Sequence, residues 1–247
     1  NTVIVKPSEV TPLTGKLYCE ALSSVLPEGV LQLAQGDGGV GEQLVSSEDV
    51  HMVAMTGSSA TGKKIMEKCA KHLKRIVLEL GGKDPMVVFA DADLDSAAKD
   101  AVDNSLFNAG QVCCAVERVY VEESIKSDFE QKVIELAKKQ KVGIPTESGV
   151  TLGPMVSQMQ LENVKNQVDD SLANGATKLY ESDFPNDGSG NFYPVTVLSD
   201  LKQDMLIQRA ETFGPVVAMS TFDGSEREAW RLANDTEYGL AGYVYTH

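Results

Sequence analysis

Residues 51–82, HMVAMTGSSATGKKIMEKCAKHLKRIVLELGG, contain the pattern that decides the fold. The segment opens with a short apolar run, residues 51–55, and closes with another, residues 75–80. Between them, Ile65, Met66 and Cys69 recur at the spacing of an amphipathic helix, which we place over residues 59–73. Strand, helix and strand in this order form a βαβ unit. The sequence therefore predicts a parallel sheet with helices on its faces.

The same alternation continues on both sides of this unit. Upstream we expect strands at residues 3–5 and 30–33, a helix over residues 17–25, and a short helix after Gly36. Downstream, a glycine pair, Gly81-Gly82, interrupts the pattern and predicts a boundary between two domains, residues 1–80 and 81–247. Beyond it we predict strands at residues 86–89, 118–122 and 193–198, helices starting near Asp91 and at residues 124–139, 157–174 and 225–234, and a polar loop over residues 184–191.

Composition narrows the class of protein. The chain has 247 residues, of which 42% are hydrophobic, so it can bury a substantial core. Its net charge of −14 gives no electrostatic reason to bind nucleic acid or an anionic membrane. No apolar run approaches the roughly 20 residues that span a bilayer. Four cysteines and three scattered histidines suggest neither a disulfide scaffold nor a metal site, so we expect an intracellular protein, cytoplasmic or organellar.

Both ends of the sequence enter predicted strands. Residues 3–5 follow directly on the first two residues, and residues 243–247 stop inside another apolar run. A domain seldom begins and ends within sheet strands. We therefore expect the sequence to be an internal part of a longer protein.

Two glycine-rich stretches resemble phosphate-binding loops. GDGGVG, residues 36–41, satisfies the dinucleotide fingerprint, but the next strand ends in Thr56 and lacks the acid that would bind a ribose. We interpret it as a glycine-rich turn that enters a helix. GSSATGKK, residues 57–64, nearly satisfies the P-loop pattern of nucleotide hydrolases, although Lys64 stands where Ser or Thr would bind magnesium. What remains is a helix start at Gly57-Ser58, which either holds a phosphate or is a plain helix cap.

Cys113 and Glu79 are the candidate catalytic residues, and the residues alone leave both open. Cys113 is either a small buried hydrophobe or a nucleophile near backbone N–H groups that lower its pKa. Glu79, at the end of the apolar run VLEL, is either a partly buried acid with a raised pKa or a solvent-facing strand end.

Seven segments in order resemble the NAD(P)-dependent aldehyde dehydrogenases. The two that resemble signature motifs are LELGGK (78–83) and NAGQVCCA (108–115). The others are NTVIVKPSEVTPLT (1–14), LPEGVLQL (26–33), MTGSSATG (55–62), ETFGPVV (211–217) and NDTEYGLAGYVYT (234–246). The resemblance covers the chain from end to end and implies an α/β fold: part of a Rossmann-like parallel-sheet cofactor domain, residues 1–80, and part of an α/β catalytic domain, residues 81–247.

By this resemblance Cys113, two positions after Gly-Gln, matches the nucleophile, and Glu79 matches the general base. Lys6 and Glu9 match positions that bind the adenosine ribose. Gly57 and Ser58 match the start of the helix that binds the pyrophosphate. Glu211 and Phe213 match positions that bind the nicotinamide ribose. The full set of expected cofactor-binding residues is Lys6, Ser8, Glu9, Gly57, Ser58, Leu80, Glu211 and Phe213.

The implied activity is oxidation of an aldehyde to a carboxylic acid, with hydrolysis of a thioester on Cys113 by water that Glu79 activates. Glu9 would repel the 2′-phosphate of NADP, so the sequence favours NAD, with NADP possible. The segments ETFGP and GLAGYVYT resemble most the semialdehyde and betaine-aldehyde branches of the family. The full-length protein is expected to be a homo-oligomer.

The chain departs from the family pattern in length. Members are much longer, and the upstream segment that supplies an asparagine to the oxyanion hole is outside this sequence, so the chain alone is expected to be inactive. The alternative is a non-catalytic remnant that serves as a binding or structural module.

Overall fold

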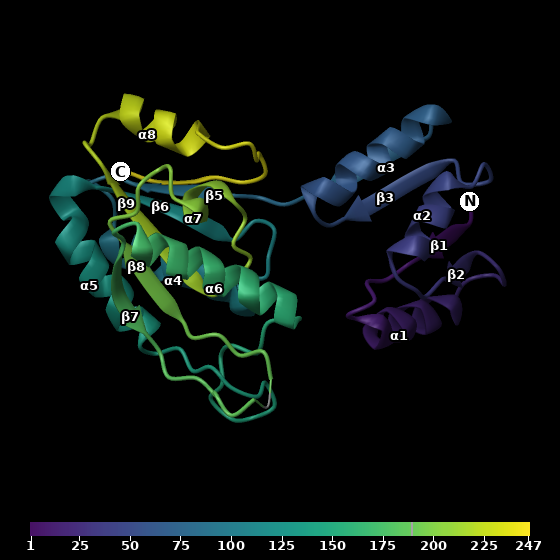
Figure 1. The fold of residues 1–247 in the computed structure, drawn as a ribbon, viewed down its shortest axis with the longest axis horizontal. Helices are drawn as coiled ribbons and strands as arrows, with labels where there is room; N and C mark the ends of the chain where they lie inside the picture. Colours follow the sequence, from purple (N-terminus) through teal and green to yellow (C-terminus); the bar gives the residue numbers. More distant parts are fainter. Residues whose placement is uncertain (189) are drawn as a thin grey trace. The chain divides into compact units, whose positions relative to one another are not determined.

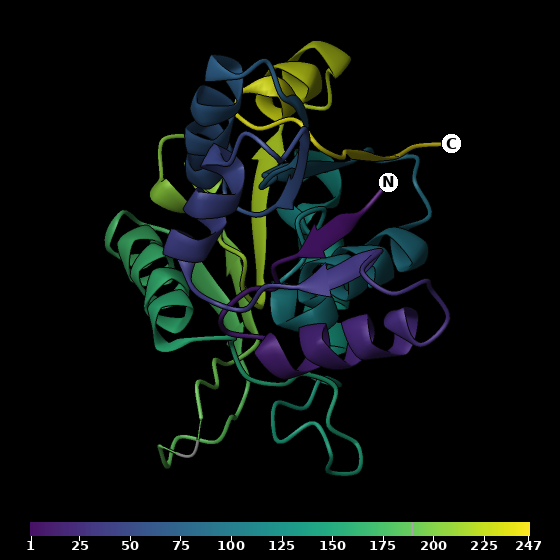
Figure 2. The same ribbon diagram turned by 90° about the vertical axis from the view of Figure 1, so that its right-hand side faces the viewer.

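Two pairs of parallel strands organise residues 1–80 of the protein in a computed structural model (Figure 1). In the first pair, β1 (Val3–Val5) lies beside β2 (Leu31–Leu33), and α1 (Pro12–Ser23) connects them. In the second, β3 (Met52–Thr56) lies beside β4 (Arg75–Glu79), and α3 (Ser59–Lys71) connects them. The short helix α2 (Gly38–Ser46) joins the two pairs. Figure 2 shows α1 lying along the β1–β2 pair. The predicted βαβ unit over residues 51–82 is therefore present.

The structure describes residues 1–188 and 190–247, which divide into two compact units, residues 1–80 and residues 81–247. Ser189, in the predicted polar loop, lies outside the described residues.

A six-stranded sheet forms the centre of residues 81–247, in the order β10-β5-β6-β9-β8-β7. Neighbouring strands are parallel except for the antiparallel pair β7–β8 at one edge. The strands are β5 (Asp84–Val88), β6 (Val116–Glu122), β7 (Thr177–Glu181), β8 (Thr196–Ser199), β9 (Val216–Phe222) and β10 (Tyr243–Tyr245).

Helices cover both faces of this sheet (Figure 1). On one face α4 (Leu94–Leu106), α5 (Lys126–Ala137) and α6 (Gln158–Ala173) contribute to the main core. On the other, α8 (Glu226–Asn234) packs in a smaller cluster. The strand alternation assigns the residues: Met86 and Val88 belong to the first core, whereas Val87 and Tyr120 belong to the second. Burial on both faces explains why these strands read as continuous apolar runs.

Several elements differ from the sequence prediction, and strand β7 and helix α7 (Leu206–Arg209) were not predicted. The helix placed at residues 17–25 instead begins at Pro12, because proline is favoured in the first turn, where its missing N–H costs nothing. The strand placed at residues 193–198 begins only at Thr196, after Pro194, which has no N–H for a sheet ladder. Strand β9, between β6 and β8, was not predicted, because its start follows the loop residues of ETFGP directly.

Among the described residues, no helix combines the length and the apolar character needed to cross a bilayer. In the same part of the chain, no three His, Cys, Asp or Glu side chains gather in a way that could hold a metal ion.

Candidate active site

Cys113 lies in a turn between a strained loop and strand β6. Helix α4 ends at Leu106, and the chain then passes through a short 3₁₀ segment, Phe107–Gly110. Three successive residues there have left-handed backbones: Asn108 at φ 53°, Ala109 at φ 58° and Gly110 at φ 73°. For alanine this conformation costs roughly 1 kcal/mol or more. Such strain persists only where surrounding contacts impose it, and it clusters at functional sites.

Gln111 supplies some of those contacts. Its side-chain amide donates to the Asn108 carbonyl at 3.1 Å, and its side-chain oxygen accepts the Val156 N–H at 2.8 Å. The Asn108 side chain donates in return to the Gln111 carbonyl at 3.1 Å. The glutamine before the cysteine therefore ties the strained loop to the segment that precedes α6.

Two glycines let backbone segments approach the cysteine turn closely. A Cβ atom on Gly110 would lie 2.0 Å from the Gly214 carbonyl oxygen, and one on Gly82 would lie 2.3 Å from the Cys113 carbonyl oxygen. No side chain fits at those distances. The loop before Cys113 thus packs directly against the loop that carries Glu211 and Phe213, so the structure brings these three predicted residues into one region of residues 81–247.

Residue Cys113 is partly exposed, whereas Cys114 is exposed. Burial has the largest effect on the pKa of the Cys113 thiol and raises it. Hydrogen bonds from the backbone N–H groups of Cys113 and Cys114 lower this pKa. The expected pKa-lowering effect of backbone N–H groups is therefore present but is outweighed by desolvation. Tyr243, on edge strand β10, donates from its hydroxyl to the Cys114 carbonyl at 2.8 Å and fixes the far side of the turn.

The Glu211 side chain is folded back on the Gly81-Gly82 segment. Its carboxylate accepts the Gly82 N–H at 3.2 Å, and a Cβ on Gly81 would lie 2.4 Å from Glu211 Oε2. Burial raises the pKa of Glu211, partly offset by the Gly82 N–H. Phe213, two residues on, has a left-handed backbone with φ 50°.

Within residues 1–80, Glu79 ends β4 beside the predicted phosphate-binding turn. It pairs with Thr56 in the sheet register, and its carbonyl accepts the Gly57 N–H at 3.0 Å. The Glu79 side chain is exposed within residues 1–80, as expected for a solvent-facing residue at the end of a strand. Leu80 follows, and its side chain fills the space over Gly62, where a Cβ would lie 2.6 Å from Leu80 Cδ2.

Gly57 and Ser58 form the start of helix α3. The Ser58 hydroxyl accepts the Thr61 N–H at 3.2 Å, so Ser58 is the helix cap. A capping side chain accepts only some of the free N–H groups at a helix N-terminus. The remaining first-turn N–H groups, at the positive end of the helix dipole, stay available to an anion. Because the helix begins at Ser59, most of GSSATGKK is helical and forms no P-loop cradle.

Lys6, Ser8 and Glu9 follow strand β1. The Lys6 ammonium donates to the Pro7 carbonyl at 2.9 Å and lies 3.7 Å from Glu9 Oε2. The Glu9 side chain is 58% exposed and that of Lys6 only 17%, so the carboxylate remains accessible to a ligand. Ser8 is exposed, and its hydroxyl accepts the Val10 N–H at a long 3.4 Å.

In the GDGGVG stretch, the side chain of Asp37 fills the helix N-terminus where a phosphate would otherwise bind. Asp37 caps helix α2, and its carboxylate accepts the Gly39 N–H at 2.9 Å. A carboxylate at a helix N-terminus repels a phosphate from the place where a pyrophosphate would bind. The interpretation of this stretch as a turn entering a helix agrees with that geometry.

The comparisons with known proteins bear on the whole chain. The family model described as "Aldehyde dehydrogenase family" matches residues 1–247. The chain belongs to the aldehyde dehydrogenase family. The predicted family and the predicted α/β fold class are thereby confirmed.

Several solved structures superpose closely on this chain. Lactaldehyde dehydrogenase from Escherichia coli is 40% identical with a TM-score of 0.95, over 100% of this chain and 52% of that chain. An NADP-dependent enzyme of E. coli is 36% identical with a TM-score of 0.94, over 100% and 51%. Betaine aldehyde dehydrogenase from Staphylococcus aureus, solved with NAD+, is 37% identical with a TM-score of 0.91, over 99% and 49%. The chain also spans 52% of the length of the curated relatives to which it is 42% identical.

A buried polar cluster behind the Glu211 loop was not identified from the sequence. Lys83 and Glu117 form an ion pair with 2.6 Å between Nζ and Oε2, and Thr212 and Gln167 join it. A signal existed in the sequence, because Glu117 and Arg118 interrupt an otherwise apolar strand, and buried charges require partners.

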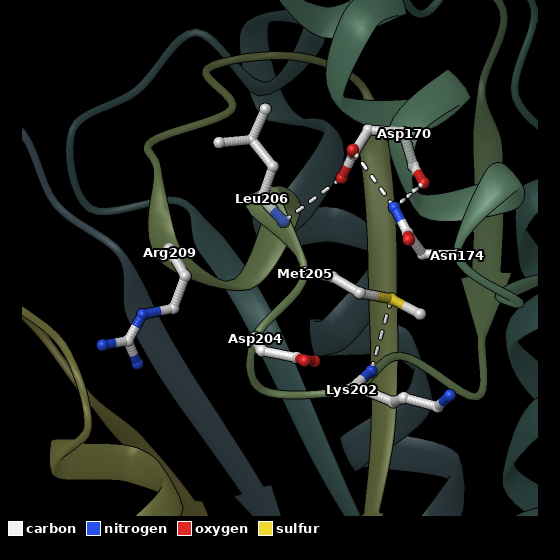
Figure 3. A pocket seen from close by; sticks show the side chains of 7 residues that line it. All are labelled: Asp170, Asn174, Lys202, Asp204, Met205, Leu206 and Arg209. Atoms are coloured by element: carbon white, nitrogen blue, oxygen red, sulfur yellow. Dashed lines mark hydrogen bonds between the residues drawn. The ribbon is translucent and has the colours of Figure 1, made fainter.

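A surface pocket of about 440 Å³ lies elsewhere on the chain, between α6 and α7 (Leu206–Arg209) (Figure 3). Asp170, at its rim, accepts the Leu206 N–H at 3.4 Å and bonds with the Asn174 side-chain amide at 3.2 Å. Arg209 pairs with Asp235 at 2.8 Å. The pocket contains none of the predicted site residues, and several of its charges are already engaged, so it does not replace the Cys113 region as the candidate site.

Proposed function

We propose that the full-length protein oxidises an aldehyde to a carboxylic acid with NAD, through a thioester on Cys113. The observation that carries the proposal is the direct packing of two loops: the strained Cys113 loop contacts the loop of Glu211 and Phe213 backbone to backbone at Gly110 and Gly214. Family membership supports the same chemistry.

Cys113 begins the reaction as a thiolate. Its sulfur forms a bond to the aldehyde carbon, and the carbonyl π electrons move to oxygen, which gives the oxyanion of a thiohemiacetal. Because burial raises the thiol pKa in the protein alone, ionisation requires a proton acceptor or a positive field near the turn. Cys113 is a partly exposed residue, which is consistent with access by a substrate.

A bound nicotinamide would supply the electron acceptor for the hydride that leaves the thiohemiacetal carbon, which becomes a thioester. Glu79 then takes a proton from water, whose oxygen attacks the thioester carbon; the C–S bond breaks and the Cys113 thiolate is released with the acid. A carboxylate at position 79 favours hydrolysis over acyl transfer to coenzyme A.

Each expected cofactor contact is assigned to named residues. Gly57 and Ser58 would receive the pyrophosphate at the α3 N-terminus, Glu9 the adenosine ribose, and Glu211 the nicotinamide ribose. The accessible Glu9 carboxylate and the uncapped first-turn N–H groups of α3 fit such a ligand. The solved relatives include both an NADP-dependent enzyme and one with NAD+, so the preference for NAD rests on Glu9.

The proposal is tested on the full-length protein with NAD, NADP and a panel of aldehydes that includes lactaldehyde, betaine aldehyde and a semialdehyde. Formation of reduced cofactor is expected for the wild type and for Cys114→Ser, and is expected to disappear in Cys113→Ser. No turnover in the wild type with any aldehyde would favour the non-catalytic alternative. Equal activity of the two cysteine variants would remove Cys113 as the nucleophile.

A further inference from the structure

Glu117 occupies an irregular position in strand β6. In the pairing of β5 with β6, Asp84 lies opposite Val116 and Pro85 lies opposite Arg118, so Glu117 is the extra residue of a β-bulge. A bulge re-aims a side chain out of the regular alternation and is frequent beside active sites. Here it points the Glu117 carboxylate at the loop that carries Glu211 and Phe213.

The charge pair of Lys83 and Glu117 is almost completely buried. The side-chain exposures are 0% for Lys83 and 7% for Glu117, and the two charges are 2.6 Å apart. Desolvation makes a buried pair a poor source of stability, since apolar residues of similar volume often serve as well or better. A role in fixing one local geometry accounts for the pair better than a contribution to stability.

That geometry belongs to the backbone of residues 211–213. The two carboxylate oxygens of Glu117 accept consecutive N–H groups, Thr212 N to Oε2 and Phe213 N to Oε1, each at 2.8 Å. Lys83 donates to the Thr212 hydroxyl at 2.9 Å. The same carboxylate therefore holds the residue before and the residue within the left-handed turn at Phe213, whose conformation is unfavourable for a bulky side chain.

Helix α6 holds the opposite, carbonyl side of this loop. The Gln160 side chain donates to the Thr212 and Phe213 carbonyls at 2.9 and 3.1 Å, and the Gln167 side chain donates to the Glu211 carbonyl at 3.0 Å. The Thr212 hydroxyl donates to Gln167 Oε1 at 2.9 Å and so joins the two sides. With its backbone held from both sides, the loop leaves the Glu211 carboxylate directed at Gly82 N–H.

We propose that Glu117 is a positioning residue that, with Lys83, holds the 211–213 loop in the conformation in which Glu211 and Phe213 receive the nicotinamide ribose. The inference rests on the proposed function, because it assigns a cofactor role to the loop. Glu117 acts through the loop backbone and does not touch substrate or cofactor.

The test uses the full-length protein and the variant Glu117→Gln. An amide keeps the shape but offers one oxygen in place of two, so one loop N–H loses its acceptor and Lys83 loses its counter-charge. Without cofactor, hydrogen exchange of the Thr212 and Phe213 amides is expected to accelerate about 10-fold to 100-fold, the usual effect of losing a hydrogen bond to a charged group. The Kd for NAD, by calorimetry, and the KM for NAD are expected to rise by a similar factor, with the KM for aldehyde little changed.

Tyr120→Phe is the matched control. Tyr120 is a fully buried residue of the same strand whose hydroxyl bonds with Arg118 at 3.0 Å and Gln203 at 2.9 Å, on the opposite face of the sheet. Its loss is expected to lower the melting temperature without changing loop exchange or NAD affinity. Thr212→Val is the second variant, for the case in which Glu117→Gln does not fold: it removes the hydroxyl between Lys83 and Gln167 and is expected to give a smaller shift in the same direction.

The outcomes separate the two proposals. A wild type that neither binds NAD nor oxidises any aldehyde removes the proposed function, and this inference with it. An active wild type whose Glu117→Gln or Thr212→Val variant keeps normal loop exchange and NAD affinity removes only the positioning role. Faster loop exchange with unchanged NAD affinity also overturns it, because the loop geometry would then be irrelevant to the cofactor.

Discussion

Asp84 carries an ionisable side chain that is buried without full compensation, and replacing it with Asn is expected to stabilise the protein at neutral and alkaline pH. Asp84 is 2% exposed. Its Oδ1 accepts the Ala241 N–H at 3.0 Å, while Oδ2 is the buried side-chain atom without a hydrogen-bond partner among the described residues. Burial raises the pKa of Asp84 from the ordinary 3.8 to about 6, and the negative charge of Glu117 acts in the same direction.

The sign and size of the effect follow from linkage. The unfolded chain loses the Asp84 proton near pH 3.8 and the folded chain only near pH 6, so the folded state is progressively penalised as pH rises through that window. Each pKa unit corresponds to about 1.4 kcal/mol, so the penalty reaches about 3 kcal/mol above the window. The amide of Asn has no charge, retains an oxygen for the Ala241 N–H, and leaves the number of unpaired polar atoms unchanged.

The assay is urea unfolding of the wild type, Asp84→Asn and the control Asp204→Asn, whose carboxylate is exposed. Near pH 8 the Asp84 variant is expected to gain up to about 3 kcal/mol, and near pH 5 about half of that. Asp204→Asn is expected to stay within about 0.5 kcal/mol of the wild type at both pH values, as ordinary surface changes do. A gain for Asp84→Asn that is the same at both pH values, or a loss near pH 8, would show that the charge of Asp84 is not the source of the penalty.

Three further predictions concern the proposed catalysis. Glu79→Gln in the full-length enzyme should give one burst of reduced cofactor per site and then little turnover, because the amide cannot take a proton from water; undiminished steady-state turnover would exclude Glu79 as the base. Iodoacetamide labelling of Cys113, followed by peptide mapping, should increase as pH rises into the alkaline range because burial raises its thiol pKa, whereas a labelling rate independent of pH would contradict that electrostatic picture. Glu9→Gln should lower the ratio of kcat/KM for NAD over NADP about 10-fold or more, since it removes a charge that repels a 2′-phosphate; a ratio that does not move would mean that Glu9 does not select the cofactor.

The alternation of strands and helices was predictable where local pattern and burial agree. Residues 51–80 satisfy this condition, and their strand, helix and strand lie within two residues of the prediction. Strand β9 was missed although its apolar run directly follows Gly214-Pro215, a dipeptide that marks a turn. Pro12 and Pro194 moved two element starts for opposite reasons, since a helix tolerates proline in its first turn whereas a strand ladder requires the missing N–H.

The tertiary contacts and backbone conformation of the Cys113 loop could not be predicted from the sequence. The Gly-Gln pair before the cysteine suggested a tight approach, but nothing in the pattern indicated which segment would be approached. In the structure the partner of Gly110 is Gly214, more than a hundred residues further along the chain. The left-handed backbone at Ala109 could not be expected either, because alanine disfavours that region and the bonds of Gln111 that help to hold the loop are made by tertiary contacts.

The sequence indicates that the buried charges of β6 need partners, but it does not identify those partners. Glu117 and Arg118 are neighbours, and in a regular strand they would face opposite sides of the sheet. Arg118 does find its partners on the α8 side, where it donates to the Leu232 and Ala233 carbonyls. The bulge at Glu117 frees its carboxylate to reach the backbone N–H groups of Thr212 and Phe213. A β-bulge is a relation between two strands, so the sequence of β6 alone could require a partner for Glu117 but could not identify the loop that provides it.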